Sequence, residues 1–267
     1  IPLFTIGSGD FQFPIDLRYV GGNGIKVSEV SSSVGLGWSL SHVGVISRTV
    51  RGKPDDHVFG YVNLPDFPNL YDPVNLDLYV NYYGNNTYDS QPDIFHLSAG
   101  ELQASFYLTK QKEVLFIEQS DLKIVPIFSP TLQAFHVRDL SGNLYVFSVI
   151  ESIKTTTYGI PNWDDSYVAS SWYLQSVSNV QGSLLAEFQY TLPSVETLQI
   201  ISRPFSYSES YTGPIDEGAL SEFLLRIKRP ILQKILFDQG SLIVKYPSYT
   251  RQDLSGDYQI DSLILED

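Results

Sequence analysis

The chain contains no cysteine and no methionine among its 267 residues, and its basic residues are few. Without cysteine it can form neither a disulfide nor a thiolate metal site. Only 17 lysines and arginines stand against 30 aspartates and glutamates, which gives a net charge of −13. Nucleic acid and anionic membranes are bound by basic surfaces, so this charge balance argues against both as partners.

Long apolar runs are also missing. No stretch is apolar over the length that crosses a membrane, and none has the pattern of a signal peptide. The first residues, "IPLFTI", already have the alternation of a strand, and no initiator methionine stands before them. We therefore expect natural residues, including an export signal, to precede Ile1.

Segments rich in alanine, glutamate, lysine and leucine, which favour helices, are nearly absent. Aromatic residues make up 13% of the chain, with 18 Tyr and 15 Phe, and such residues favour half-buried pleated surfaces. The sequence therefore predicts an all-β fold, a succession of antiparallel hairpins that form a large twisted sheet, a sandwich or a partial shell. We expect one domain over residues 1–267 with about fourteen to eighteen strands and little helix.

A hairpin unit recurs from Asp93 onward. Each copy has an alternating apolar run, a polar turn that ends in glycine, and a second alternating run; the four glycines are Gly100, Gly142, Gly182 and Gly240. We expect each glycine to supply the positive φ of a tight turn. Residues 1–20 form a further predicted hairpin, and 25–30, 43–50 and 112–128 add strands. The spacing of the units is too irregular for a propeller or a solenoid.

Two segments break this pattern. Residues 61–92 are rich in Tyr, Asn, Asp and Pro and predict a long surface loop with one short helix or strand around Val74–Tyr82. Ordered loops of this length are uncommon and often functional. Residues 206–223 are a polar insertion, and 217–227 are compatible with one helical turn.

Motifs of catalysis and cofactor binding are lacking. Gly35 and Gly37 fit neither phosphate-binding glycine pattern, because Trp38, Ser39 and Leu40 follow them. The four histidines have no metal-binding spacing, and no nucleophile elbow occurs. We therefore expect no cofactor, no metal and no catalytic residue. The least arbitrary acids for glycoside hydrolysis are Asp93 and the pair Asp164–Asp165.

The most distinctive stretch is "VGLGWSL" at residues 34–40. Its glycines allow close backbone approach, and its tryptophan is expected to fill the core. The structural motif comprises Gly35, Leu36, Gly37, Trp38 and Leu40.

With its flanks, "FPIDLRYVGGNGIKVSEVSSSVGLGWSLSHVGVISRTV", this stretch resembles the N-terminal segment of large secreted Rhs (YD-repeat) proteins and the start of toxin-complex B components. Further similarity lies in "QPDIFHLS" (91–98), "GNLYVF" (142–147), "SSWYLQSV" (170–177) and "YQIDSLIL" (258–265). The Y-D-x-x-G-R half of the repeat is missing. The repeats proper are therefore expected beyond Asp267.

The resemblance implies a role in a hollow β shell that encloses a C-terminal toxin or effector. This chain would be an N-terminal part or cap of the shell in a secreted or cell-surface bacterial protein. Its partners would be the downstream YD-repeat shell of the same polypeptide and a protein cargo. No catalytic residue is carried over.

Exposed aromatics suggest an alternative from another class, a glycan-binding or adhesive surface module. The candidate ligand-contact residues are Tyr79, Tyr82, Tyr83, Tyr88, Trp163 and Tyr167. Such rings stack on sugars or meet a protein partner, but tyrosines of a long loop also pack that loop onto its sheet. A third alternative, a glycoside-active enzyme, would depend on Asp93 or Asp165. We expect the non-enzymatic scaffold.

Overall fold

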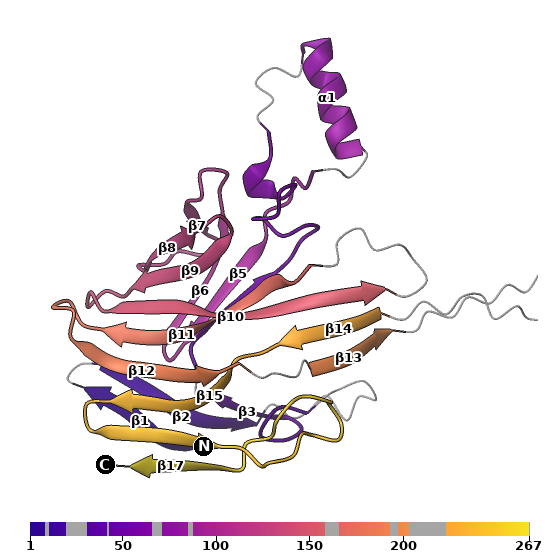
Figure 1. Cartoon of the computed structure of the whole chain (residues 1–267). Helices are drawn as coiled ribbons and strands as arrows, with labels where there is room; N and C mark the ends of the chain where they lie inside the picture. The colour runs from indigo at the N-terminus through magenta and orange to yellow at the C-terminus, as the bar shows by residue number, and fades with distance from the viewer. Residues whose placement is uncertain are drawn as a thin grey trace, which may run out of the picture.

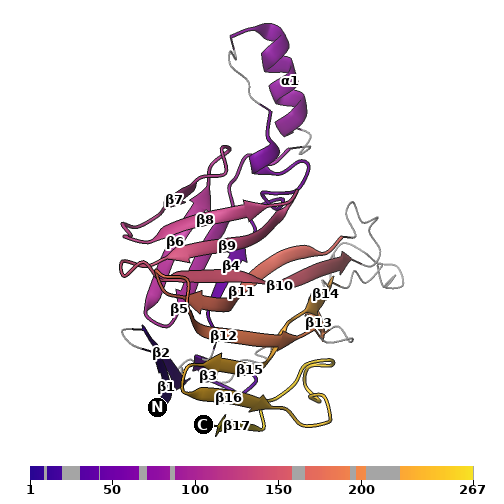
Figure 2. The same ribbon diagram turned by 60° about the vertical axis from the view of Figure 1, so that its left-hand side comes forward.

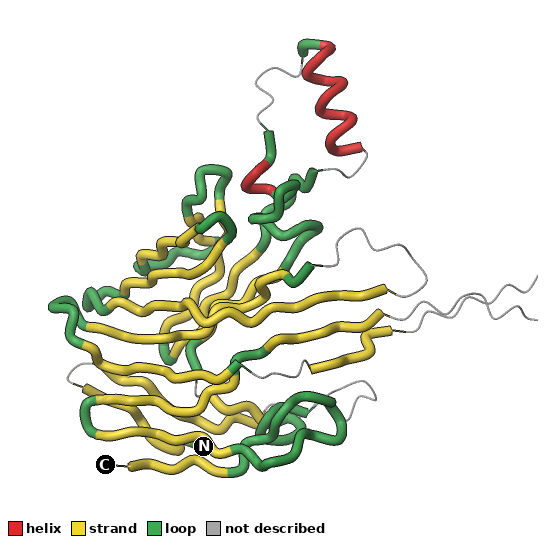
Figure 3. Tube along the Cα trace, in the orientation of Figure 1, coloured by secondary structure: helices red, strands yellow, loops and turns green. Residues whose placement is uncertain are grey.

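The computed structural model describes residues 1–8, 11–19, 31–41, 43–65, 71–84, 88–157, 166–192, 197–202 and 223–266. This part contains 17 strands, one α-helix and one 3₁₀-helix, which confirms the all-β prediction. Figure 3 shows how completely strands dominate, with both helices confined to one end of the molecule.

The elements have the following bounds. The strands are β1 (Pro2–Ser8), β2 (Phe11–Tyr19), β3 (Trp38–Ser41), β4 (Val45–Thr49), β5 (Ile94–Ala99), β6 (Leu102–Leu108), β7 (Val114–Phe116), β8 (Lys123–Phe128), β9 (Leu132–Arg138), β10 (Leu144–Thr157), β11 (Val168–Ser178), β12 (Leu184–Thr191), β13 (Thr197–Ser202), β14 (Phe223–Lys228), β15 (Ile231–Phe237), β16 (Gly240–Lys245) and β17 (Ser262–Glu266). The helices are η1 (Tyr61–Asn63) and α1 (Pro73–Gly84).

Two sheets organise the described chain. A small antiparallel sheet has the order β1-β2-β3, and a 14-stranded sheet contains the other strands (Figure 1). Its centre is the pair β10 and β11, which have 14 and 11 residues. Each is long enough for two neighbours along its outer edge. β11 pairs with β4 and with β12, whereas β10 pairs with β9 and with β14.

The large sheet therefore divides into two long arms that both leave from β11. One arm continues through β4, β5, β6 and β7, and another through β12, β15, β16 and β17. Figures 1 and 2 show the second arm descending to the C-terminal strand β17, with the small sheet beside it. The two arms diverge because β4 pairs with residues 171–173 of β11 and β12 pairs with residues 176–178.

An aromatic cluster fills the space between the first arm and β9–β11. Trp172 of β11 is fully buried, and its ring lies 5.2 Å from that of Phe135 and 5.9 Å from that of Phe95. Phe106 of β6 stacks on Phe95 at 5.4 Å. Aromatic pairs at these distances add to the gain from burying apolar area.

The small sheet packs on one face of the second arm, against β12 and β15. Phe13 of β2 meets Phe188 of β12 edge-on at 5.5 Å, and Phe4 of β1 lies 6.0 Å from Phe237 of β15. These residues belong to the same hydrophobic cluster as the aromatic group around Trp172. The two sheets thus share one core.

The four hairpin glycines occupy the turns that the sequence predicts. Gly100, Gly142, Gly182 and Gly240 have φ values of 59°, 82°, 84° and 150°. They lie at the β5–β6, β9–β10, β11–β12 and β15–β16 connections. The predicted hairpins, and the positive φ of their glycines, are confirmed.

The two irregular segments have different outcomes. The short element expected around Val74–Tyr82, which the sequence left open as a helix or a strand, is the helix α1, and it stands away from the sheets in Figures 1 and 2. The helical turn expected within 217–227 is wrong for its described part, because Phe223–Lys228 forms strand β14 and pairs with β10. Residues 206–222, and the strand expected at 25–30, lie outside the described ranges.

Candidate functional site

The "VGLGWSL" motif forms the third strand of the small sheet and the turn before it. Gly35 and Gly37 both have positive φ, 114° and 74°. A Cβ on Gly37 would lie 2.9 Å from the Tyr19 ring, so the close approach expected of this glycine is present. Leu40 packs against the core, whereas Leu36 is exposed.

Trp38 does not fill the core, which corrects the expectation from the sequence. It is half-buried, and its ring lies 5.0 Å from Tyr19, its cross-strand partner in β2. The tryptophan at the centre of the core is Trp172. Trp38 therefore stabilises the edge of the small sheet through one aromatic pair.

The segment between β4 and β5, residues 50–93, carries α1 and is called the excursion below. A buried cluster of charges lies where this excursion leaves the sheet. The guanidinium of Arg48, on β4, donates from Nε to Asp93 Oδ2 at 2.7 Å and from Nη2 to Asp56 Oδ1 at 2.7 Å. The side chains of Arg48 and Asp93 are both fully buried. The Arg48 guanidinium also lies 5.6 Å from the centre of the Phe95 ring, close to the aromatic cluster.

Asp55 and Asp93 tie the two ends of the excursion together. The Asp55 amide donates to Asp93 Oδ2 at 2.9 Å, and the Asp93 amide donates to Asp55 Oδ1 at 3.0 Å. Nearby, the Lys53 amide donates to Asp89 Oδ2 at 2.7 Å. Gly60 is required at the base of the excursion, because a Cβ there would overlap the Pro54 carbonyl oxygen. The sheet therefore holds the base of the excursion in one geometry.

Asp55 is an unusual member of this cluster. It is 1% exposed, and its Oδ2 has no hydrogen-bond partner. Burial and the charge of Asp93 raise its pKa from 3.8 to about 7. Burial also raises the pKa of Asp93, against the opposing effect of Arg48. For Arg48 itself burial lowers the pKa, but Asp56 and Asp93 outweigh it and the net shift is upward.

A second polar cluster joins the N- and C-terminal parts of the chain. Glu151 accepts from Arg229 Nε at 2.7 Å, from the Tyr173 hydroxyl at 3.0 Å and from the Ser170 hydroxyl at 3.1 Å. Arg251 contacts Asp257 at 2.9 Å and donates to the Ser31 carbonyl oxygen at 2.8 Å.

A cavity of about 370 Å³ lies between these groups, bordered among others by Tyr173, Tyr190 and Tyr246. Its charged groups already pair with one another, so the cluster first of all holds the fold.

The nominated aromatics do not converge on one site. Tyr79 and the backbone of Tyr82 and Tyr83 lie on α1, Tyr88 packs edge-on against Phe59 at 5.2 Å, and Trp163 lies outside the described ranges. The Tyr167 ring lies 3.7 Å from the Lys228 ammonium, on the wall of a separate cavity of about 350 Å³. Within the described chain these residues are spread over three regions.

The acids nominated for glycoside hydrolysis do not form a catalytic pair within the described ranges. Asp93 is sealed in the buried cluster with hydrogen bonds to both oxygens, from Arg48, Arg51 and Asp55. A carboxylate so enclosed has no face to offer a substrate. Asp164 and Asp165 lie outside the described ranges.

One feature of the sequence points to the Arg48 cluster, although the motifs considered above do not include it. In "VISRT" the inward-facing positions of β4 are Ile46 and Arg48, both buried. A charged residue at an apolar position of a strand demands a buried partner. That partner, Asp93, stands 45 positions away, and only the fold brings it near.

No group of three or more His, Asp or Glu side chains within the described ranges could hold a metal ion. Of the histidines, His96 contacts the Ser105 hydroxyl at 2.9 Å, and His42 is outside these ranges. Among the helices described, none is long and apolar enough to cross a membrane.

Comparison of the chain with protein-family models, with curated proteins and with solved structures finds no match.

Proposed function

We propose that the chain is a non-enzymatic structural module of a secreted or cell-surface bacterial protein. In this proposal its bent sheet is one part of a larger β shell, which later strands of the same polypeptide complete around a protein cargo. The resemblance to Rhs proteins suggests the class. The state of strand β17 is the observation that carries the proposal.

β17 is the last strand of its arm, and among the described strands it pairs only with β16. Leu265 stands opposite the buried Leu242 but is itself 52% exposed, and Ile264 on the other face is 40% exposed. A strand that is apolar on both faces is typical of the interior of a sheet rather than its edge.

Natural edge strands are usually protected by lysine, proline or a bulge. The sequence of β17, "SLILE", contains neither lysine nor proline and has a single charge, Glu266, at its last residue, and its pairing with β16 has no register shift. An unprotected apolar edge favours the addition of another strand. A shell that grows strand by strand requires such an edge.

The charged clusters support a structural role as well. In both, the carboxylates accept hydrogen bonds from arginines and neighbouring backbone or hydroxyl groups. They connect segments that are distant in sequence, such as Ser31 with Arg251. The first cluster fixes the base of the excursion on the sheet, and the second joins β10 and β11 to Arg229.

The edge can be tested with the chain alone. Sedimentation velocity over a range of concentrations should show self-association through β17, and Leu265→Lys should abolish it because a lysine at this position blocks strand addition. Leu140→Lys, at an exposed hairpin position, is the matched control and should associate like the parent. Near-ultraviolet circular dichroism checks that both variants are folded. A parent chain that remains monomeric, or a control that loses association equally, would contradict the proposal.

A further inference from the structure

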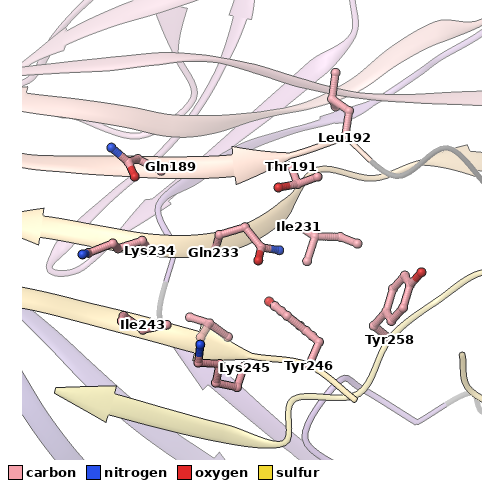
Figure 4. A pocket seen from close by; sticks show the side chains of 11 residues that line it. Gln189, Thr191, Leu192, Ile231, Gln233, Lys234, Ile243, Lys245, Tyr246 and Tyr258 are labelled. Carbon is pink, nitrogen blue, oxygen red and sulfur yellow. The ribbon is translucent and has the colours of Figure 1, made fainter. Parts of the chain in front are cut away.

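A groove of about 680 Å³ lies over β12, β15 and β16, and Figure 4 shows the side chains that line it. Phe188 of β12 packs on Phe13 of the small sheet, so the next residue, Gln189, faces the groove on the opposite side. The register places Gln189, Lys234 and Ile243 in one row across the three strands. The preceding row, Phe188, Ile235 and Leu242, is buried on the opposite face. The groove volume lies within the range of ligand-binding sites, about 300–1,000 Å³.

A β-bulge adds an amide to the groove. Gln189 pairs with Lys234 but Tyr190 pairs with Leu232, so Gln233 is the extra residue of β15. In a regular strand Gln233 and Lys234 would point to opposite faces, whereas both line the groove. Bulges often re-aim a side chain in this way beside functional sites.

Two tyrosines form the end of the groove away from Gln189 and Lys234 (Figure 4). The rings of Tyr246 and Tyr258 lie 6.3 Å apart and meet edge-on at 74°. The Tyr246 hydroxyl donates to the Leu232 carbonyl oxygen at 2.9 Å, which fixes that ring. The loop that carries Tyr258 is held by the ion pair of Arg251 with Asp257. The aromatic end is therefore preorganised.

Among the described residues, two lysines and no carboxylate line the groove itself, and Glu187 lies beside it, where it accepts from Gln189 Nε2 at 3.4 Å. Lys234 and Lys245 both line it, and neither forms an ion pair with any described residue. No aspartate or glutamate is among the described residues that line it, although the chain carries a net charge of −13. A ligand with carboxylate groups would complement this charge.

We propose that this groove binds an acidic oligosaccharide. The lysine ammoniums pair with the sugar carboxylates, the amides of Gln189 and Gln233 bond to hydroxyls, and a tyrosine ring packs on the apolar face of a sugar. An acidic peptide fits less well. β15 and β16 each have neighbours on both sides, so they offer no free backbone for strand addition.

Among the side chains that the structure describes, none of the tyrosines nominated from the sequence, on α1 or at Tyr88 and Tyr167, lines this groove, and the proposal goes beyond the scaffold role. The groove lies on the face of the arm, whereas the scaffold proposal concerns the free edge of β17. Either proposal can fail while the other stands.

The test is isothermal titration of the chain with trigalacturonate and sialyllactose, with maltotriose and lactose as neutral counterparts. We expect the acidic sugars to bind at least tenfold more tightly than the neutral ones, and the affinity to fall with added salt. Tyr258→Ala and Lys234→Met should each weaken binding about tenfold or more. Tyr249→Ala, an exposed tyrosine of the same loop, and Lys123→Met on β8 are the matched controls.

Three results would overturn the proposal. The first is no binding of either acidic sugar. The second is equal binding of the neutral sugars, or equal losses in the control variants. The third is full competition by a short polyglutamate peptide, which would assign the groove to an acidic peptide.

Discussion

Asp55 should make the stability of the protein depend on pH in an unusual direction. Its carboxyl is buried at the base of the excursion, with Arg48, Asp56, Asp93 and Tyr61 as its charged or titratable neighbours. The pKa of Asp55 is about 7 in the folded protein, and the ordinary value for an aspartate, 3.8, applies in the unfolded chain. Between these values the folded protein keeps a proton that the unfolded chain has lost.

The contribution of Asp55 to the free energy of unfolding is therefore complete at low pH and is lost as pH rises through this window. Each unit of pH costs about 1.4 kcal/mol, so the full loss is on the order of 4 kcal/mol. Asp55→Asn mimics the protonated form, since its amide oxygen can still accept from the Asp93 backbone. The variant should be the more stable protein at pH 8.

The assay is urea unfolding followed by tryptophan fluorescence, which reports on the buried Trp172. From pH 5 to pH 8 the stability advantage of Asp55→Asn over the parent should widen by roughly 2–3 kcal/mol. Comparing variant with parent cancels the titration of groups distant from Asp55, but not that of Asp93, which contacts it. Asp121→Asn, at an exposed loop position, is the matched control and should run parallel to the parent. Parallel curves for Asp55→Asn would refute the reasoning.

Five substitutions at four positions test the fold itself by the same unfolding assay. Gly182→Ala should cost about 1–2 kcal/mol through its positive φ alone, since a Cβ there meets nothing within 4 Å; Gly182→Asn should cost less, and equal costs would contradict this. Trp172→Ala should cost about 3–5 kcal/mol and Trp38→Ala clearly less, so a reversed order would refute the assignment of the core tryptophan. Asp93→Ala should cost about 3–5 kcal/mol because it leaves Arg48 buried with one carboxylate fewer, and a change below 1 kcal/mol would show that the pair is not sealed.

Local chemistry made the hairpins predictable. A polar turn ending in glycine between alternating runs specifies a hairpin without reference to the rest of the chain, as Gly100 and Gly142 show. The sequence also placed a short element around Val74–Tyr82, but it did not decide between a helix and a strand there.

What depends on distant partners could not be predicted. β11 takes one neighbour from residues 45–47 and another from residues 184–187, and neither choice is written in its own sequence. Trp38 and Trp172 both lie in strands, but only the strand order decides which one is buried.

The sites follow the same rule. The sequence analysis did not single out Arg48, although a charge at an inward position of a strand could have signalled it, and its pairing with Asp93 depends on the fold. The groove depends on a bulge at Gln233, and a bulge is a property of the pairing between β12 and β15 rather than of either strand. The aromatic residues were nominated by residue type, and residue type does not tell which of them lie close together in the fold.

The central claim is that this sheet continues into a larger shell. The most direct measurement is limited proteolysis of the natural polypeptide that contains residues 1–267, with mass mapping of the resistant fragments. The account predicts that these residues remain inside one large protected particle, with β17 shielded by a neighbouring strand. Release of residues 1–267 as a separate stable fragment would contradict it.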